Sequence, residues 1–328
     1  MDDDILIEDT PKRRFRLPGI LRGSRGRRTG LIALAAILVI LLLYYPVGAL
    51  LINRIDDDPN FGPGDVPPEA SRAVAVSAAL IDREVRQHAW PANDPWFLPG
   101  AFLDNMPNYQ QGIIAALSRF AVEMTDQIGR SRGSSRADPD LEKAGGLLKY
   151  PGDVWLWDPS VSWLPTASSV NQYISARDAL IAYNKRLVAG NAVFEKRADN
   201  LLGVLNRIAA DLGSSSAVLE QRIETNSGVL IDTQADDIFY NTKGRLYAYA
   251  LVLRELGKDF DQVLKEKDAE AVWNQMLESL FRAAGMRPWV VVNGSPDGQF
   301  LPNHLAGEGF LLLRARTQLR EITDVLVK

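Results

Sequence analysis

One stretch of the chain constrains its fold more than any other: the 25 residues from Thr29 to Asn53 carry no charge. A helix rises about 1.5 Å per residue, so this length spans roughly 37 Å and can cross a hydrocarbon core of about 30 Å with some tilt. A helix also satisfies its own backbone polar groups, as lipid requires. The stretch therefore predicts a single transmembrane helix over 29–53. A buried core helix is the alternative, but arginines flank the run.

The charges on either side of this stretch predict its orientation. Residues 1–28 hold eight Lys or Arg and five acidic residues, whereas Arg54 is followed by Asp56, Asp57 and Asp58. The positive-inside rule then puts the N-terminus in the cytoplasm. A cleaved signal peptide is the rival interpretation, but the run is long and ends in GALLINRIDDD, a poor cleavage site. We expect an uncleaved signal anchor, with a basic cytoplasmic tail over 1–28, a linker over 54–68 and a domain over 69–328 beyond the membrane.

Charge and cysteine content exclude several functions for that domain. The whole chain carries −4 and the tail +3, so the residues that follow the tail carry −7. Nucleic acid is therefore not expected as a partner, because phosphate binding needs a basic face. The chain has no cysteine. Disulfides, thiolate metal sites and a cysteine nucleophile are excluded together.

Apolar periodicity predicts an all-α fold, a helical bundle with a minor β-hairpin. The predicted helices cover residues 67–87, 108–128, 140–149, 170–212, 213–228, 238–264, 269–284 and 307–328. The clearest strand signal is WVVVNGSPDGQFLP at 289–302, where Asn-Gly and Asp-Gly pairs favour a hairpin turn.

The segment 170–212 predicts one long helix, roughly 60 Å over about 40 residues. Its apolar residues recur every seven positions: Tyr173, Leu180, Leu187, Phe194, Leu201 and Ile208. Asn184 and Asn191 fall in the same seam, where a buried Asn can fix register. Packing within its own chain is the favoured interpretation, because Gly190 and Gly203 weaken an isolated helix. An intermolecular coiled coil is the alternative.

Motifs for catalysis, cofactors and metals are absent from the sequence. Only two histidines exist, His88 and His304, and neither has the companions that a zinc site needs. The nucleotide-binding and serine hydrolase fingerprints are missing. Asp232, Asp236 and Asp237 are better explained as helix N-caps than as a calcium loop. We therefore predict no catalytic residue, no cofactor and no metal.

Five of the seven tryptophans lie in two proline-rich loops, WPANDPWFLP and WLWDPSVSWLP. Aromatic rings beside carboxylates suit the stacking of sugar rings or of peptide prolines. The candidate ligand-binding residues are Trp90, Asp94, Trp96, Trp155, Trp157, Asp158 and Trp163. The favoured alternative is that these rigid loops only cover the helical core.

Several stretches together resemble a known family: the basic tail, LLLYYPVGALL, the acidic linker, WPANDPWFLPGAFLDNMPNYQQG and RPWVVVNGSPDGQFLPNHLAGEGFLLLRART. The chain resembles an uncharacterised proteobacterial family of inner-membrane proteins that carries a domain of unknown function. The resemblance implies a Gram-negative inner membrane with the large domain in the periplasm, and it implies no activity.

These observations favour a non-enzymatic interaction or scaffold protein of the cell envelope. Its expected partners are the lipid bilayer and either another envelope protein or further copies of itself. The alternative is an envelope enzyme or a cell-wall binding module that uses the tryptophan loops.

Overall fold

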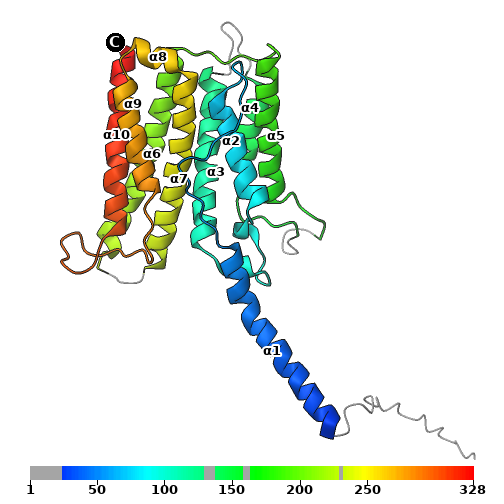
Figure 1. Cartoon of the computed structure of the whole chain (residues 1–328). Helices are drawn as coiled ribbons and strands as arrows, with labels where there is room; N and C mark the ends of the chain where they lie inside the picture. The colour runs from blue at the N-terminus through cyan, green and yellow to red at the C-terminus, as the bar shows by residue number, and fades with distance from the viewer. Residues whose placement is uncertain (1–23, 129–136, 158–162, 229–231) are drawn as a thin grey trace, which may run out of the picture. The chain divides into compact units, whose positions relative to one another are not determined.

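The computed structural model describes residues 24–128, 137–157, 163–228 and 232–328. Most of the predicted basic tail, residues 1–23, lies outside this range. The chain divides into two compact units, Met1–Gly48 and Ala49–Lys328. We call the second one the helical unit. The predicted all-α fold is confirmed, because the described residues form helices joined by loops and turns (Figure 1).

The first helix, α1, runs from Ser24 to Ile52 and contains all of the uncharged stretch except its last residue, Asn53. Its span from Arg27 to Ile52 has a mean hydropathy of 2.5, and none of it is buried in the protein. Exposed leucines and isoleucines cover it all round. A helix that is apolar on every side needs an apolar environment, which the described residues do not supply. Within the described residues it is the one helix long and apolar enough to cross a membrane.

The helical unit contains nine further α-helices among its described residues. They are α2 (Arg72–Asp82), α3 (Asn105–Glu123), α4 (Pro139–Leu147), α5 (Ser169–Val188), α6 (Ala198–Asn226), α7 (Thr233–Asp259), α8 (Asp261–Glu266), α9 (Glu270–Ala284) and α10 (His304–Val327). Short π and 3-10 turns are η2 (Arg83–Gln87), η3 (Pro91–Asn93), η4 (Pro99–Phe102) and η5 (Met124–Ile128).

Successive long helices run in alternating directions, as Figure 1 shows. The loops before α3, between α4 and α5, and between α9 and α10 therefore lie at one end of the unit, which we call the lower end. The α3 helix packs on α7, whereas α6 packs on α10. One continuous cluster of buried apolar side chains links these helices.

Residues 54–71 form no helix or strand, and they follow the bundle from its lower end to the opposite end. At the lower end, the Arg54 N–H donates to Met106 Sδ over 3.2 Å. At the other end, Ser71 Oγ donates to Asp259 Oδ2 over 2.8 Å. Ser71 also caps α2, which begins at Arg72 and not at the predicted Pro67. The bundle satisfies the carbonyl groups of this segment through the side chains of Arg83, Tyr109, Tyr247 and Arg254.

Glycines allow α3 and α7 to approach each other closely. A Cβ atom added to Gly112 would lie 2.1 Å from the Asn241 carbonyl oxygen. One added to Gly244 would lie 2.0 Å from the Tyr109 carbonyl oxygen. Both contacts are with backbone, so a side chain at either position would push the two helices apart. Glycine at these two positions therefore sets the spacing of the central helix pair.

The prediction of one long helix over 170–212 was wrong. The chain leaves α5 at Val188 and enters α6 at Ala198, with Gly190 in the left-handed region at φ 73°. Five of the six stripe residues are buried, and they belong to two helices: α5 packs on α2 and α4, whereas α6 packs on α10. Phe194, the sixth, is half-buried in the loop between these helices. The separate helix predicted at 213–228 is the continuation of α6 to Asn226.

The predicted hairpin at 289–302 is also not formed as a pair of strands. One isolated antiparallel bridge joins Asn293 to Asn303 within the described residues. The Gly294 N–H donates to the Pro302 carbonyl over 3.0 Å. The Asn303 side chain caps α10 by accepting from the Ala306 N–H, so this asparagine ends the loop and does not extend a strand.

Candidate functional site

The two tryptophan loops lie against each other at the lower end of the helical unit. Trp90 Nε1 donates to the Gly152 carbonyl over 2.8 Å, and Asn93 Nδ2 donates to the Val154 carbonyl over 3.1 Å. The rings of Phe97 and Trp155 meet edge to face with centroids 5.7 Å apart. Residues far apart in the sequence therefore form one surface.

The structure divides the predicted site residues into different environments. Trp90 is 5% exposed and packs edge to face on Tyr173, with centroids 5.2 Å apart. It therefore belongs to the core. Trp155 is half-buried. Trp96, Trp157 and Trp163 are exposed. Asp158 lies outside the described residues.

Asp94 is the one predicted carboxylate within the described residues, and it is half-buried. A Cβ atom added to Gly100 would lie 2.1 Å from Asp94 Oδ2, so the carboxyl group packs against the Gly100 backbone. Burial raises the pKa of Asp94 above its ordinary value. The carboxyl group thus helps to shape the loop at Gly100.

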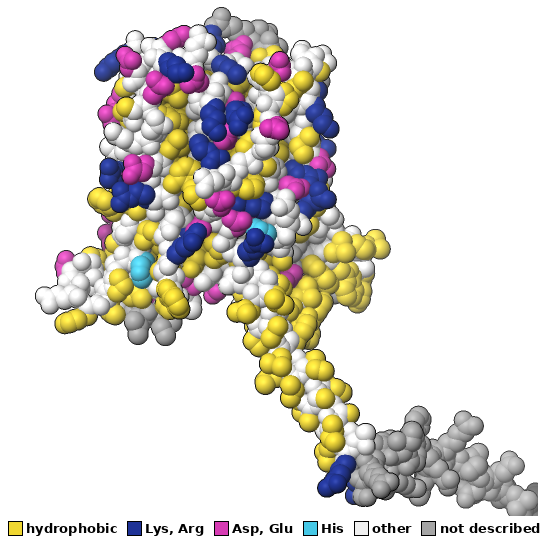
Figure 2. All heavy atoms as spheres, in the orientation of Figure 1, with side chains coloured by type: hydrophobic (Ala, Val, Ile, Leu, Met, Phe, Trp, Pro, Cys, Tyr) yellow, Lys and Arg dark blue, Asp and Glu magenta, His cyan; other side chains and the backbone are white. Residues whose placement is uncertain are grey.

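The exposed rings of the two loops form a single apolar surface, visible at the lower end of the helical unit in Figure 2. We call it the aromatic rim and define it as Trp96, Phe97, Phe102, Trp157 and Trp163. Trp96 and Trp163 are 77% and 82% exposed. Trp157 Nε1 donates to the Trp163 carbonyl over 3.3 Å, which ties the second loop together. Exposed patches of this kind mark interaction surfaces in soluble domains.

A second exposed apolar group lies on the loop between α9 and α10. It consists of Trp289, Val290 and Phe300, and the two rings are 103% and 93% exposed. These residues are not among the predicted site residues, because the sequence pattern of this segment predicts a hairpin. A usable signal was present, since large apolar residues stand on both sides of a polar Asn-Gly-Ser-Pro-Asp-Gly stretch.

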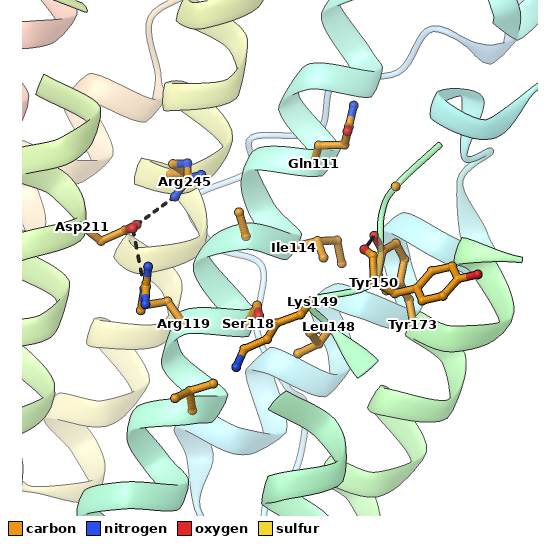
Figure 3. A pocket seen from close by; sticks show the side chains of 13 residues that line it. Gln111, Ile114, Ser118, Arg119, Leu148, Lys149, Tyr150, Tyr173, Asp211 and Arg245 are labelled. Atoms are coloured by element: carbon orange, nitrogen blue, oxygen red, sulfur yellow. Dashed lines mark hydrogen bonds and ion pairs between the residues drawn. The ribbon is translucent and has the colours of Figure 1, made fainter. Parts of the chain in front are cut away.

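A groove of about 390 Å³ opens on the side of the bundle, between α3, α6, α7 and the turn that follows α4 (Figure 3). Arg119 and Arg245 approach Asp211 from α3 and α7, with N–O distances of 3.8 and 2.9 Å. The Tyr249 hydroxyl also donates to Asp211 over 2.8 Å. Lys149 also lines the groove, which therefore contains three cations and one carboxylate, a composition that suits an anionic group.

Carboxylates gather where α3 and α7 begin. Asp236 lies near Asp104 and Asp237, and burial together with these two charges raises its pKa to about 6. Asp232 is the residue that caps α7, through the Ala235 N–H, so capping by Asp236 or Asp237 was wrong. No group of three potential metal ligands occurs among the described residues.

The two histidines have local structural contacts. His88 Nδ1 lies 3.5 Å from Glu84 Oε2. His304 Nδ1 accepts the Val292 N–H over 2.9 Å, which joins the start of α10 to the preceding loop. Burial lowers the pKa of His304, in keeping with a neutral ring that accepts this bond.

Comparison with known proteins agrees with the sequence resemblance. The sequence profile of a family described as uncharacterised protein conserved in bacteria, DUF2333, matches residues 69–235 and 230–328. No curated protein and no solved structure matches the chain significantly. The matched residues make up most of the helical unit and include both tryptophan loops and the loop between α9 and α10. The chain therefore belongs to this uncharacterised family that is conserved in bacteria.

Proposed function

We propose that the protein is a membrane-anchored interaction protein of the bacterial cell envelope, with α1 as its anchor and the helical unit in the periplasm. The observation that carries this proposal is that no residue of the apolar span of α1 is buried among the described residues. An apolar helix of this length finds its environment in a bilayer. The basic residues before it and the aspartates after it support a cytoplasmic N-terminus.

An interaction role is supported by the surface of the helical unit. The aromatic rim and the loop between α9 and α10 expose large aromatic rings, which a loop with only a structural role would bury. In the groove of Figure 3, the carboxylate of Asp211 is already engaged by Arg245 and Tyr249. That carboxylate therefore serves to position its neighbours. Net negative charge on the residues beyond the tail disfavours nucleic acid as the partner.

Topology can be tested directly. A reporter enzyme that folds only outside the cytoplasm is fused after Lys328, and a reporter that is active only in the cytoplasm is fused there in a second strain. We expect activity from the first fusion alone. As a matched control, the eight basic residues that precede the uncharged stretch are replaced by neutral ones, which should give a mixed orientation. Activity from the cytoplasmic reporter alone in the unaltered chain would reject the proposal.

A second candidate function is the binding of cell-wall glycan or peptide by the tryptophan loops. The convergence of the two loops favours it, because three exposed indoles lie on one surface. Titration of the full chain in detergent with soluble cell-wall fragments should then change tryptophan emission. Trp163→Gln should weaken the response, whereas Trp273→Phe, a change on α9 away from the loops, should leave it intact.

A further inference from the structure

We propose that the aromatic rim is a membrane-docking surface, through which the helical unit rests on the interface of the bilayer that holds its own anchor. The lipid interface is its partner, and the exposed indoles lie at the level of the headgroups. This inference rests on the proposed function, because it requires α1 to span the membrane.

The first support is the position of the rim relative to the start of the helical unit. The Arg54 N–H is bonded to Met106 at the beginning of α3. The rim residues Trp96 to Phe102 directly precede α3, and the second loop is joined to the first. Arg54 lies two residues after α1, a distance of at most about 7 Å along an extended chain. The lower end of the unit is therefore held near the end of the membrane span.

The second support is that this connection is fixed to the bundle. Asp57 is buried, and its carboxylate is 2.6 Å from Lys243 Nζ. The Asp56 carbonyl accepts hydrogen bonds from Tyr109 and Arg83, each over 2.8 Å. A flexible linker would let the unit turn freely, whereas these bonds allow little freedom between Arg54 and the bundle. These bonds therefore keep the lower end of the unit attached to the residues that directly follow α1.

The third support is the chemistry of the exposed residues. Tryptophan is enriched where membranes meet water, because its indole is apolar with one polar N–H. The rim exposes three tryptophans and two phenylalanines. The loop that exposes Trp289 and Phe300 also lies at the lower end, on the other side of residues 54–57 in Figure 1. Two apolar groups on either side of the connection suit a broad, flat partner such as a leaflet.

Other occupants fit the observations less well. A sugar or peptide site needs polar side chains beside its rings to fix orientation. Among the described candidates, Asp94 packs against Gly100 and the Trp157 indole N–H is bonded to a carbonyl. A second copy of the chain would need a complementary surface held at the same height above the membrane. The lipid interface needs neither, and the anchor already brings it to the rim.

Tryptophan fluorescence offers a direct test, because all seven tryptophans lie beyond α1. The full chain is reconstituted into phosphatidylcholine vesicles whose acyl chains carry bromine at a shallow position. Bromine quenches indoles that contact the acyl chains. We expect Trp96, Trp163 and Trp289 to account for most of the quenched emission. Successive Trp→Gln changes at these sites should remove the quenched emission. Trp273→Phe, which removes a buried indole, should not.

Controls separate failure of docking from failure of the anchor. Flotation of the vesicles after alkaline washing reports insertion of α1 independently of the rim. If the vesicles float, but the emission is quenched by aqueous acrylamide and not by brominated lipid, docking of the rim is overturned. Insertion of α1 in the membrane is then still supported. Shielding of the rim from both quenchers would also overturn docking, since a protein would then cover it. Loss of flotation would reject the proposed function and this inference with it.

Discussion

Lys243 Nζ lies 2.6 Å from Asp57 Oδ2, and both side chains are almost completely buried. The lysine ammonium also donates to the Ala284 and Met286 carbonyls, and the Arg287 guanidinium donates to both Asp57 oxygens. Burial by itself would raise the pKa of Asp57, but hydrogen bonds from Arg287 and Lys243 outweigh it and lower this pKa. The pair fastens the segment after α1 to α7 and α9.

Asp57→Asn should therefore destabilise the helical unit strongly, because it leaves the Lys243 charge buried without its counterion. Loss of one partner of a buried pair costs about 3–5 kcal/mol. Denaturant unfolding of the full chain in detergent, followed by circular dichroism, measures this cost. The matched control is Asp65→Asn, an exposed position in the same segment. The double change Asp57→Asn with Lys243→Met should cost less than the two single changes added together, and strict additivity would contradict the pairing.

The role of this segment could not be predicted from its composition. Its prolines, glycines and aspartates predicted a linker, and the absence of helix and strand over 55–68 agrees with that. Its attachment depends on partners more than a hundred positions away, such as Lys243 for Asp57 and Tyr247 for the Asp58 carbonyl. Local patterns carry no information about such partners. The proposed boundary at residue 69 stays a prediction.

Replacement of Gly244 by Ala should destabilise the α3–α7 pair. The new Cβ would lie 2.0 Å from the Tyr109 carbonyl oxygen, so the helices must separate, at a cost of about 2 kcal/mol or more. Gly146→Ala on α4 is the matched control, since nothing lies within 4 Å of its added Cβ. That change should stabilise the protein by up to about 1 kcal/mol through helix propensity. Equal unfolding midpoints for the two variants would contradict close packing at Gly244.

The periodic stripe predicted buried residues correctly but not their connection. Leu187 and Leu201 are buried, as expected, although they lie on different helices. A sevenfold repeat can continue across a short loop, because the spacing of apolar residues does not record whether the backbone between them is helical. Asn184, assigned to the seam, instead exchanges two hydrogen bonds with the backbone of Ser71, the residue that caps α2.

Leu201→Asp should therefore unfold or strongly destabilise the bundle. Leu201 has no exposed surface, and a carboxylate at this position would lose its water without gaining a partner, at a cost of several kcal/mol. Val188→Asp is the matched control, because Val188 is 46% exposed at the end of α5. Thermal unfolding distinguishes the two variants. A wild-type midpoint for Leu201→Asp would show that this side of α6 faces water.

The sequence predicted which two loops contain the candidate site. It did not predict which of their rings are buried in the core and which are exposed. Trp90 and Trp96 lie in one short motif, yet Trp90 is 5% exposed and Trp96 is 77% exposed. The difference comes from Tyr173, which covers Trp90 from α5 and is more than eighty residues away. Composition shows that rings are present in a loop. Only the tertiary structure shows which of them are buried.

The carboxylates at the start of α3 and α7 predict a pH dependence of stability. Burial and the charges of Asp104 and Asp237 raise the pKa of Asp236 to about 6 in the folded protein, above its ordinary value of 3.8. The folded state therefore holds this proton more tightly than the unfolded state. The resulting stabilisation is fully present below pH 3.8 and is lost as the pH rises through about 6. Burial also raises the pKa of Glu308 on α10, which acts on stability in the same direction.

Asp236→Asn should remove the part of this dependence that falls between about pH 4 and pH 6. At pH 7.5 the variant should be more stable than the wild type, by on the order of 1 kcal/mol, because Asp236 is partly exposed and solvent screens its charge. At pH 4 the two proteins should differ little. Denaturant midpoints at both pH values measure the change, and Asp324→Asn, an exposed position on α10, serves as the matched control. A variant that is less stable than the wild type at pH 7.5 would mean that the Asp236 charge is favourably paired in the folded protein.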